Sequence, residues 1–174
     1  MVLSSDLKWN DYTPHIITSA FKQLCMLRRL KVLGTAVPEL KDVYIKQIRS
    51  VLELAVPVWH SSLTQGNISD IERVQKTSLH IILGDEYVSY QNALSITSLE
   101  PLDARRKRLC SKFATKAVKH NKHSNWFKIN KKVTITRQQQ PRFCHVVSRT
   151  NRFNRSPISY LTSLLNDKYK KRKT

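Results

Sequence analysis

Five basic residues near the middle of the chain have the type and the spacing needed to bind phosphate groups. They are Arg105, Arg108, Lys112, Lys116 and Lys119, separated by three or four positions. At 100° per residue, an α-helix gathers them within an arc of roughly 80° and spreads them over about 20 Å. A nucleic-acid backbone carries its charges on this length scale. The pattern therefore predicts a basic ridge, made of these five residues, that contacts phosphates; the alternative is a helix face that meets only water.

The overall charge favours the same kind of partner. Lys and Arg number 31 against 12 Asp and Glu, which gives a formal charge of +19 over 174 residues. Such an excess indicates nucleic acid first and a membrane surface second. Because phosphate contacts carry no sequence information, we expect binding of low specificity. Arg28, Arg29 and Lys31 are further candidates for backbone contacts.

The sequence lacks the common motifs of catalytic and metal-binding sites. The chain has no P-loop, G-x-S-x-G or G-x-G-x-x-G motif, and it contains only three glycines. Two-metal phosphoryl transfer needs convergent carboxylates, whereas the adjacent Asp85 and Glu86 point apart on a predicted loop. His120-x-x-His123 with Cys144-His145 matches no standard zinc spacing. We therefore predict no catalysis, no metal and no cofactor.

The cysteines and the apolar segments indicate an intracellular protein. Cys25, Cys110 and Cys144 form no disulfide framework, which suits a reducing compartment, nuclear or cytoplasmic. Cys110 is interpreted as a packed thiol, although neighbouring cations could lower its pKa. The chain begins without a signal-peptide pattern, and no apolar run approaches the roughly 20 residues of a membrane span. The tryptophans Trp9, Trp59 and Trp126 are interpreted as core or turn anchors rather than base-stacking platforms.

The elements that must position these residues are mostly helices. Strand-type alternation is rare, so we predict a mainly α fold: a small helical bundle with a short strand remnant at Val2-Leu3 and an extended basic C-terminal tail. A first helix is expected from Thr13-Pro14 to Gly34. Its predicted apolar stripe is Ile17, Ala20, Leu24, Leu27 and Leu30.

The two apolar-periodic segments between Lys41 and Gly84 are expected to form the central helices of the bundle. The first of these helices begins slightly earlier, at Pro38, and Pro57 should end or kink it near Leu54. A turn over residues 61–67 follows, and a capping box at 69–72 predicts the start of the second helix. A short helix over 89–96 and a long one from Pro101 to about His120 come next. The predicted packing residues of the long helix are Leu102, Leu109, Phe113 and Ala117.

The composition changes after residue 120. The last 54 residues hold 14 basic residues and one acid, Asp167. We predict mostly extended chain over 122–155 and one short helix near 157–166. The expected organisation is a first helix with a preceding junction at 1–35, a helical domain at 36–121 and a basic tail at 122–174.

Six stretches, in the same order, resemble one family. They are LSSDLKWNDYTPHI, LRRLKVLG, YIKQIRSVLELAVPVWHSSLT, IERVQKTSLHIILGDEYVSYQNAL, LEPLDARRKRLCSKFATKAVKH and NRFNRSPISYLTSLLN. These six stretches resemble the region after the catalytic core of reverse transcriptases from non-LTR retrotransposons, especially jockey-like elements. Ser50, Leu54 and Ser78 depart from the usual Pro, Tyr and Ala of that family.

The resemblance implies a thumb and its following helices, with residues 1–35 at the palm–thumb junction. In the family the thumb closes over the template–primer duplex, and the catalytic aspartates lie upstream in the palm. The implied partners are therefore an RNA–DNA or DNA duplex and the missing palm. Two alternatives remain open: a relic reading frame of a decayed retroelement, and a helical protein-interaction module, which needs an exposed apolar patch.

Overall fold

A computed structural model describes residues 9, 12–120, 123–130, 142–144 and 150–171. It is mainly helical, which confirms the predicted fold class. The predicted strand remnant at Val2-Leu3 lies outside the described residues, as does much of the tail predicted over 122–155. The chain divides into two compact units. Unit 1 comprises Met1–Ala55 and Leu63–Arg105, and unit 2 comprises Val56–Ser62 and Arg106–Thr174, which differs from the three consecutive ranges expected from the sequence.

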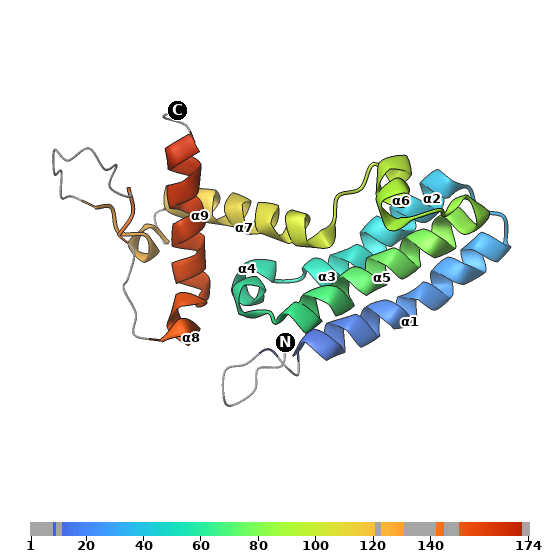
Figure 1. Ribbon diagram of the computed structural model, residues 1–174, viewed down its shortest axis with the longest axis horizontal. Coiled ribbons are helices and arrows are strands. Elements are labelled where there is room, and N and C mark those ends of the chain that lie inside the picture. Colours follow the sequence, from blue (N-terminus) through green and yellow to red (C-terminus); the bar gives the residue numbers. More distant parts are fainter. Residues whose placement is uncertain (1–8, 10–11, 121–122, 131–141, 145–149, 172–174) are drawn as a thin grey trace. The chain divides into compact units, whose positions relative to one another are not determined.

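Unit 1 is built on a long helix pair. Helix α1 (Tyr12–Val32) packs along α5 (Gln65–Leu83), and the two lie side by side in Figure 1. The remaining elements are α2 (Val37–Val43), a π-helical segment (Tyr44–Arg49), α3 (Ser50–Glu53), a 3-10 turn (Gly84–Glu86) and α6 (Tyr90–Thr97). The buried positions of α1 include Ile16, Ala20, Leu24 and Leu27, so Ile16 takes the place predicted for Ile17.

The π-helical segment keeps one side of a long helical run buried. Its buried residues recur at every fourth position, as Leu40, Tyr44, Ile48 and Leu52. In a regular α-helix this spacing drifts around the axis by about 40° at each step. The wider π turn offsets part of that drift. The run ends at Leu54 as predicted, where Ala55 adopts a positive φ of 54°.

The start of α5 was predicted wrongly. The helix begins at Gln65, because the Thr64 side chain accepts a hydrogen bond from the Asn67 backbone N–H at 3.2 Å. The predicted turn over 61–67 is thus partly helical, and the capping box at 69–72 is not the start. Glu72 instead accepts the backbone N–H of Leu102 at 3.1 Å and the hydroxyl of Tyr90. Its carboxylate therefore caps a helix 30 residues further along the chain.

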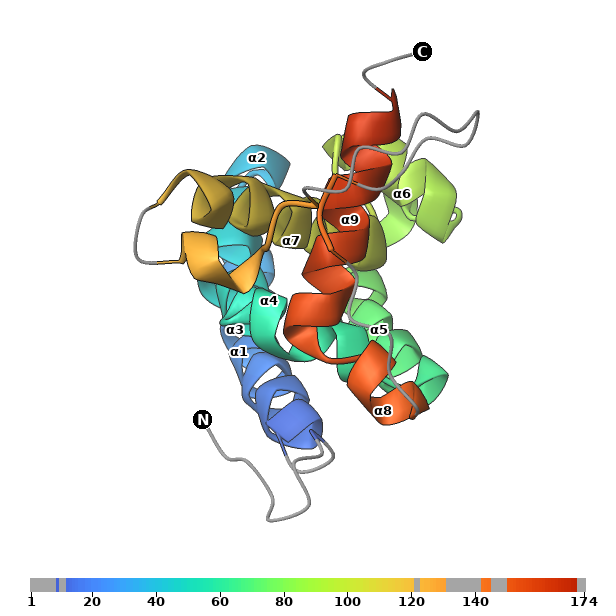
Figure 2. The ribbon, with the colours of Figure 1, turned by 90° about the vertical axis from the view of Figure 1, so that its left-hand side faces the viewer.

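Unit 2 contains most of α7 (Leu102–Lys119) and the C-terminal helix α9 (Pro157–Lys171), which is longer than the predicted helix at 157–166. Its shorter elements are α4 (Val56–Trp59), α8 (Asn151–Asn154) and 3-10 turns at His60–Ser62 and Ser124–Trp126. Figure 2 shows α8 leading into α9. The side-chain amide of Asn166 pairs with both backbone groups of Phe143, at 2.9 and 3.1 Å. This pair fixes the segment around Phe143 to α9.

The packing face of α7 differs from the predicted one. Its buried residues are Leu102, Arg106, Cys110, Ala114 and Ala117. Leu109 is half-buried, and Phe113 is 39% exposed. Within the part of the chain that the structure describes, no helix combines the length and the apolar character needed to cross a membrane.

Candidate nucleic-acid interface

The two units differ completely in charge. Unit 1 holds 11 basic and 11 acidic residues, whereas unit 2 holds 20 basic residues and a single acid, Asp167. The whole formal charge of +19 therefore lies in unit 2. This separation of charge is sharper than the one expected from the sequence, where the basic tail was predicted at 122–174. The added part is α7 from Arg106 onward.

Four of the five residues of the predicted basic ridge gather on one surface. Arg108, Lys112, Lys116 and Lys119 are exposed on α7 and line a depression of about 750 Å³. Lys168 of α9 lines the same depression, and its ammonium donates a hydrogen bond to Thr115 Oγ1 at 3.1 Å. Sequence spacing could not identify Lys168, because it comes from a different helix. We call these four ridge residues and Lys168 the basic surface.

Arg105, the fifth ridge residue, has a different role. Its guanidinium donates to both carboxylate oxygens of Glu53, one of them at 3.1 Å, and to Glu100 at 3.4 Å. The side chains of Arg105 and Glu53 are only 20% and 15% exposed. The hydrogen bonds to Glu53 raise the pKa of Arg105. Arg105 is therefore an internal ion-pair partner of unit 1 and lies outside the lining of this depression; its phosphate contact stays a prediction.

A polar network surrounds this ion pair. Arg49 also approaches Glu53, at 3.3 Å. Burial, together with the nearby Arg105, lowers the pKa of Arg49. The buried hydroxyl of Tyr44 donates to Gln75 Oε1 at 2.9 Å, and burial raises the pKa of Tyr44. Unit 1 thus uses its charged and polar groups to hold its own helices together.

The three candidates on α1 also belong to unit 1. The Lys31 ammonium donates to the carbonyl of Ile82 at 2.9 Å, near the C-terminal end of α5. A cation at this position stabilises the negative end of the helix dipole. Arg28 and Arg29 are exposed. Lys31 therefore has a structural role that its sequence position did not reveal.

The remaining candidates are distributed as follows. Cys110 is fully buried, and burial raises the pKa of its thiol to about 12, which confirms the packed-thiol interpretation. Trp59 is fully buried in the core, whereas Trp126 is 43% exposed. Asp85 and Glu86 are exposed on a 3-10 turn. Among the described residues, no three His, Cys, Asp or Glu side chains are grouped to hold a metal ion, and His145 lies outside them.

Comparisons with protein-family models, with curated proteins and with solved structures give no match to this chain.

Proposed function

We propose that unit 2 binds the sugar-phosphate backbone of nucleic acid through the basic surface. The observation that carries this proposal is the separation of charge between the units, 20 basic residues against one acid in unit 2. A unit with a single carboxylate cannot neutralise its cations internally. An external polyanion can neutralise them, and the release of its counterions then drives binding.

The geometry of α7 supports a linear polyanion. Lys112 and Lys116 lie about 6 Å apart along the helix axis, and Lys119 follows about 4.5 Å further on. In the described part of the chain, none of these three lysines forms an ion pair. Their ammonium groups therefore remain available to phosphates, and Lys168 widens the row from the neighbouring helix.

The resemblance to non-LTR reverse transcriptases supplies the proposed origin of this surface. A thumb region contacts template–primer backbone and leaves phosphoryl transfer to the palm. We therefore assign the chain a binding role within an RNA-directed DNA polymerase of that kind, and no reaction of its own.

The test is the salt dependence of binding to an RNA–DNA duplex of mixed sequence. For the double variant Lys112→Ala/Lys116→Ala, the log–log slope of affinity against salt should fall by about 2, because two phosphate contacts are lost. The matched control is Lys22→Ala/Lys46→Ala, which removes the same charge from exposed positions of unit 1. That control should leave the slope within about 0.5 of the original.

Equal slopes for the two double variants would contradict the proposal, as would binding that does not depend on salt.

The relic alternative is tested separately by thermal unfolding. A functional unit with the buried core described above should melt cooperatively, whereas a decayed fragment should not.

A further inference from the structure

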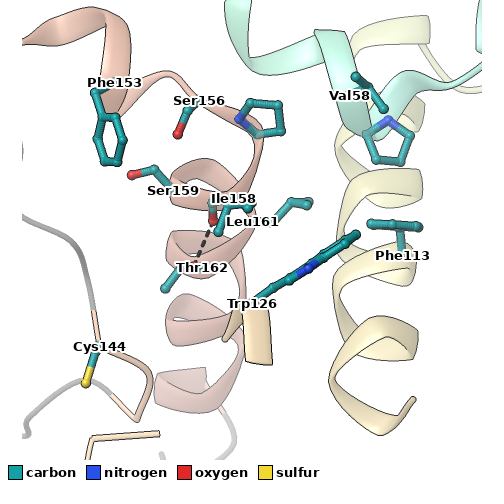
Figure 3. A pocket seen from close by; sticks show the side chains of 12 residues that line it. Val58, Phe113, Trp126, Cys144, Phe153, Ser156, Ile158, Ser159, Leu161 and Thr162 are labelled. Carbon is teal, nitrogen blue, oxygen red and sulfur yellow. Dashed lines mark hydrogen bonds between the residues drawn. The ribbon is translucent and has the colours of Figure 1, made fainter. Parts of the chain in front are cut away.

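Unit 2 contains an apolar groove that the proposed phosphate contacts do not use. The groove has a volume of about 620 Å³. Figure 3 shows Phe113 on α7 opposite the side chains of α9, with Val58 above them on the α4 segment. The lining residues are Pro57, Val58, Phe113, Trp126, Cys144, Phe153, Ser156, Pro157, Ile158, Ser159, Leu161 and Thr162.

The groove exposes several large apolar side chains. Five of its large apolar side chains are between 39% and 47% exposed: Val58, Phe113, Trp126, Phe153 and Ile158. A concave site lined by apolar and aromatic side chains with a few polar groups is a candidate ligand site. Phe113 is the clearest case. It points within about 20° of the buried Leu102 and Arg106 around α7, so it lies on the packing side of its helix and is still not covered.

Three of the five exposed apolar side chains in the groove are aromatic: Phe113, Trp126 and Phe153. In Figure 3 the Trp126 indole extends toward the ring of Phe113. The ring of His123 lies 4.4 Å from that of Trp126, and the ring of His120 lies 5.4 Å from that of His123. Several flat π surfaces thus follow one another at the end of α7. Flat aromatic ligands stack on such surfaces.

The groove and the basic surface are adjacent. Phe113 lines both the groove and the depression that holds Lys112, Lys116 and Lys168. A ligand that occupies both must carry a row of negative charges on one side and flat apolar groups on the other. A single strand of nucleic acid has this chemistry, because its unpaired bases can stack on aromatic side chains while cations follow its phosphates.

We infer that the groove binds unpaired bases of a single-stranded nucleic acid whose phosphates lie on the basic surface. This inference rests on the proposed function and adds a preference within it. Bases in a duplex are already stacked and paired, so they cannot enter the groove without the cost of being flipped out. The basic surface therefore serves both forms of nucleic acid, whereas the groove serves only the single strand. Ser159 also lines the groove, and its buried hydroxyl has no hydrogen-bond partner in the described structure; a base that displaces the atoms covering this hydroxyl can bond it.

The experiment uses the full chain and two probes at the same low salt: an oligothymidylate of roughly 12 nucleotides and a duplex of the same length. Trp126→Leu keeps an apolar side chain but removes the ring. It should weaken oligothymidylate binding by about tenfold and leave duplex binding unchanged. Trp126→Phe retains a stacking surface and should retain most of the affinity.

A second variant, Phe113→Leu, removes the opposite ring and should act in the same direction. Oligothymidylate should also quench the fluorescence of Trp126, and Trp126→Phe should abolish that component. The inference is overturned if Trp126→Leu and Phe113→Leu leave oligothymidylate binding unchanged, or if they weaken both probes equally. It is also overturned if Trp126→Leu instead dissolves a self-associated form of the chain, since the groove would then hold a second copy. Loss of duplex binding on Lys112→Ala/Lys116→Ala tests the proposed function independently of these results.

Discussion

The two units use the same basic residue types in opposite ways. In unit 1, Arg105 and Arg49 converge on Glu53, and Lys31 bonds a backbone carbonyl at the end of α5. The charges of that unit cancel, with 11 of each sign. Unit 2 holds 20 basic residues and one acid. Its lysines on α7 line the same depression as Lys168 of α9.

This difference shows that the position of a basic residue on a helix does not determine its role. Arg105 and Lys112 lie on the same face of α7, seven residues apart. Arg105 is held by two carboxylates, whereas Lys112 is exposed beside further cations. The nearby acids decide whether a cation holds the fold together or remains available for a ligand.

The largest expected effect is the loss of the ion pairs of unit 1. Glu53→Gln keeps the shape of the side chain but leaves Arg49 and Arg105 without their shared anion. Because these groups are largely buried, we expect a loss of about 2 kcal/mol in the free energy of unfolding, measured by denaturant titration. The control is Asp42→Asn, whose pair with Lys46 is 61% and 69% exposed on its two sides. It should cost less than about 0.5 kcal/mol.

Equal losses for Glu53→Gln and Asp42→Asn would remove the distinction between the two kinds of cation. A third variant tests the cations of unit 2. Lys112→Ala should leave the unfolding free energy within about 0.5 kcal/mol of the original while weakening nucleic-acid binding.

The next effect concerns a buried titratable group in the core of unit 2. Burial raises the pKa of Cys110 from 9.0 to about 12, so the folded state keeps a proton that the unfolded state releases above pH 9. The stability that this thiol contributes is present below the unfolded pKa and is lost as the pH rises toward the folded pKa. The advantage of the original chain over Cys110→Ala should therefore shrink by about 1 to 2 kcal/mol between about pH 8 and about pH 11.

Thermal or denaturant unfolding of both proteins across this range gives the measurement. Comparing the two proteins removes the alkaline contribution of Tyr44 and Tyr90, whose pKa values are also raised by burial. A constant difference between the proteins would show that Cys110 ionises equally in both states.

Local patterns were sufficient to predict most of the helices. The residue types present predicted that two helices end near Gly34 and Gly84, which both have positive φ. They also predicted the break at Leu54. The spacing from Arg108 to Lys119 correctly placed four cations on one face of α7, because helical periodicity is a short-range property.

Long-range partners could not be predicted in this way. Glu53 reaches Arg105 across 52 positions, and Glu72 reaches Leu102 across 30. Glu72 has a local interpretation within a capping box, and its tertiary contact with Leu102 overrode that interpretation. Glu53 keeps its local pair with Arg49 and adds the distant Arg105. The same limit applies to Trp126, which was predicted to be an anchor: its exposure depends on which elements of unit 2 fail to cover it.

A smaller effect is expected on thiol reactivity, with an internal control. Cys25 in unit 1 and Cys144 in the groove are both exposed, whereas Cys110 is buried. A thiol reagent should label the first two in the folded chain. Saturating oligothymidylate should slow the labelling of Cys144 severalfold and leave Cys25 unchanged, because the ligand occupies only the groove. Mass spectrometry of the labelled peptides would identify each site, and equal protection of both cysteines would point to a general effect of the polyanion.

The smallest effect is expected from a single hydroxyl in the groove. Ser159 Oγ is buried without a hydrogen-bond partner among the described residues, whereas the hydroxyl of the neighbouring Thr162 donates to the Ile158 carbonyl at 2.7 Å. If a base edge bonds Ser159, Ser159→Ala should weaken oligothymidylate binding by about threefold to tenfold without lowering stability, since the folded chain loses no internal bond. Thr162→Val removes a hydroxyl that is already satisfied and should leave binding unchanged. Unchanged binding by Ser159→Ala would show that the bases contact Trp126 and Phe113 without a hydrogen bond to Ser159.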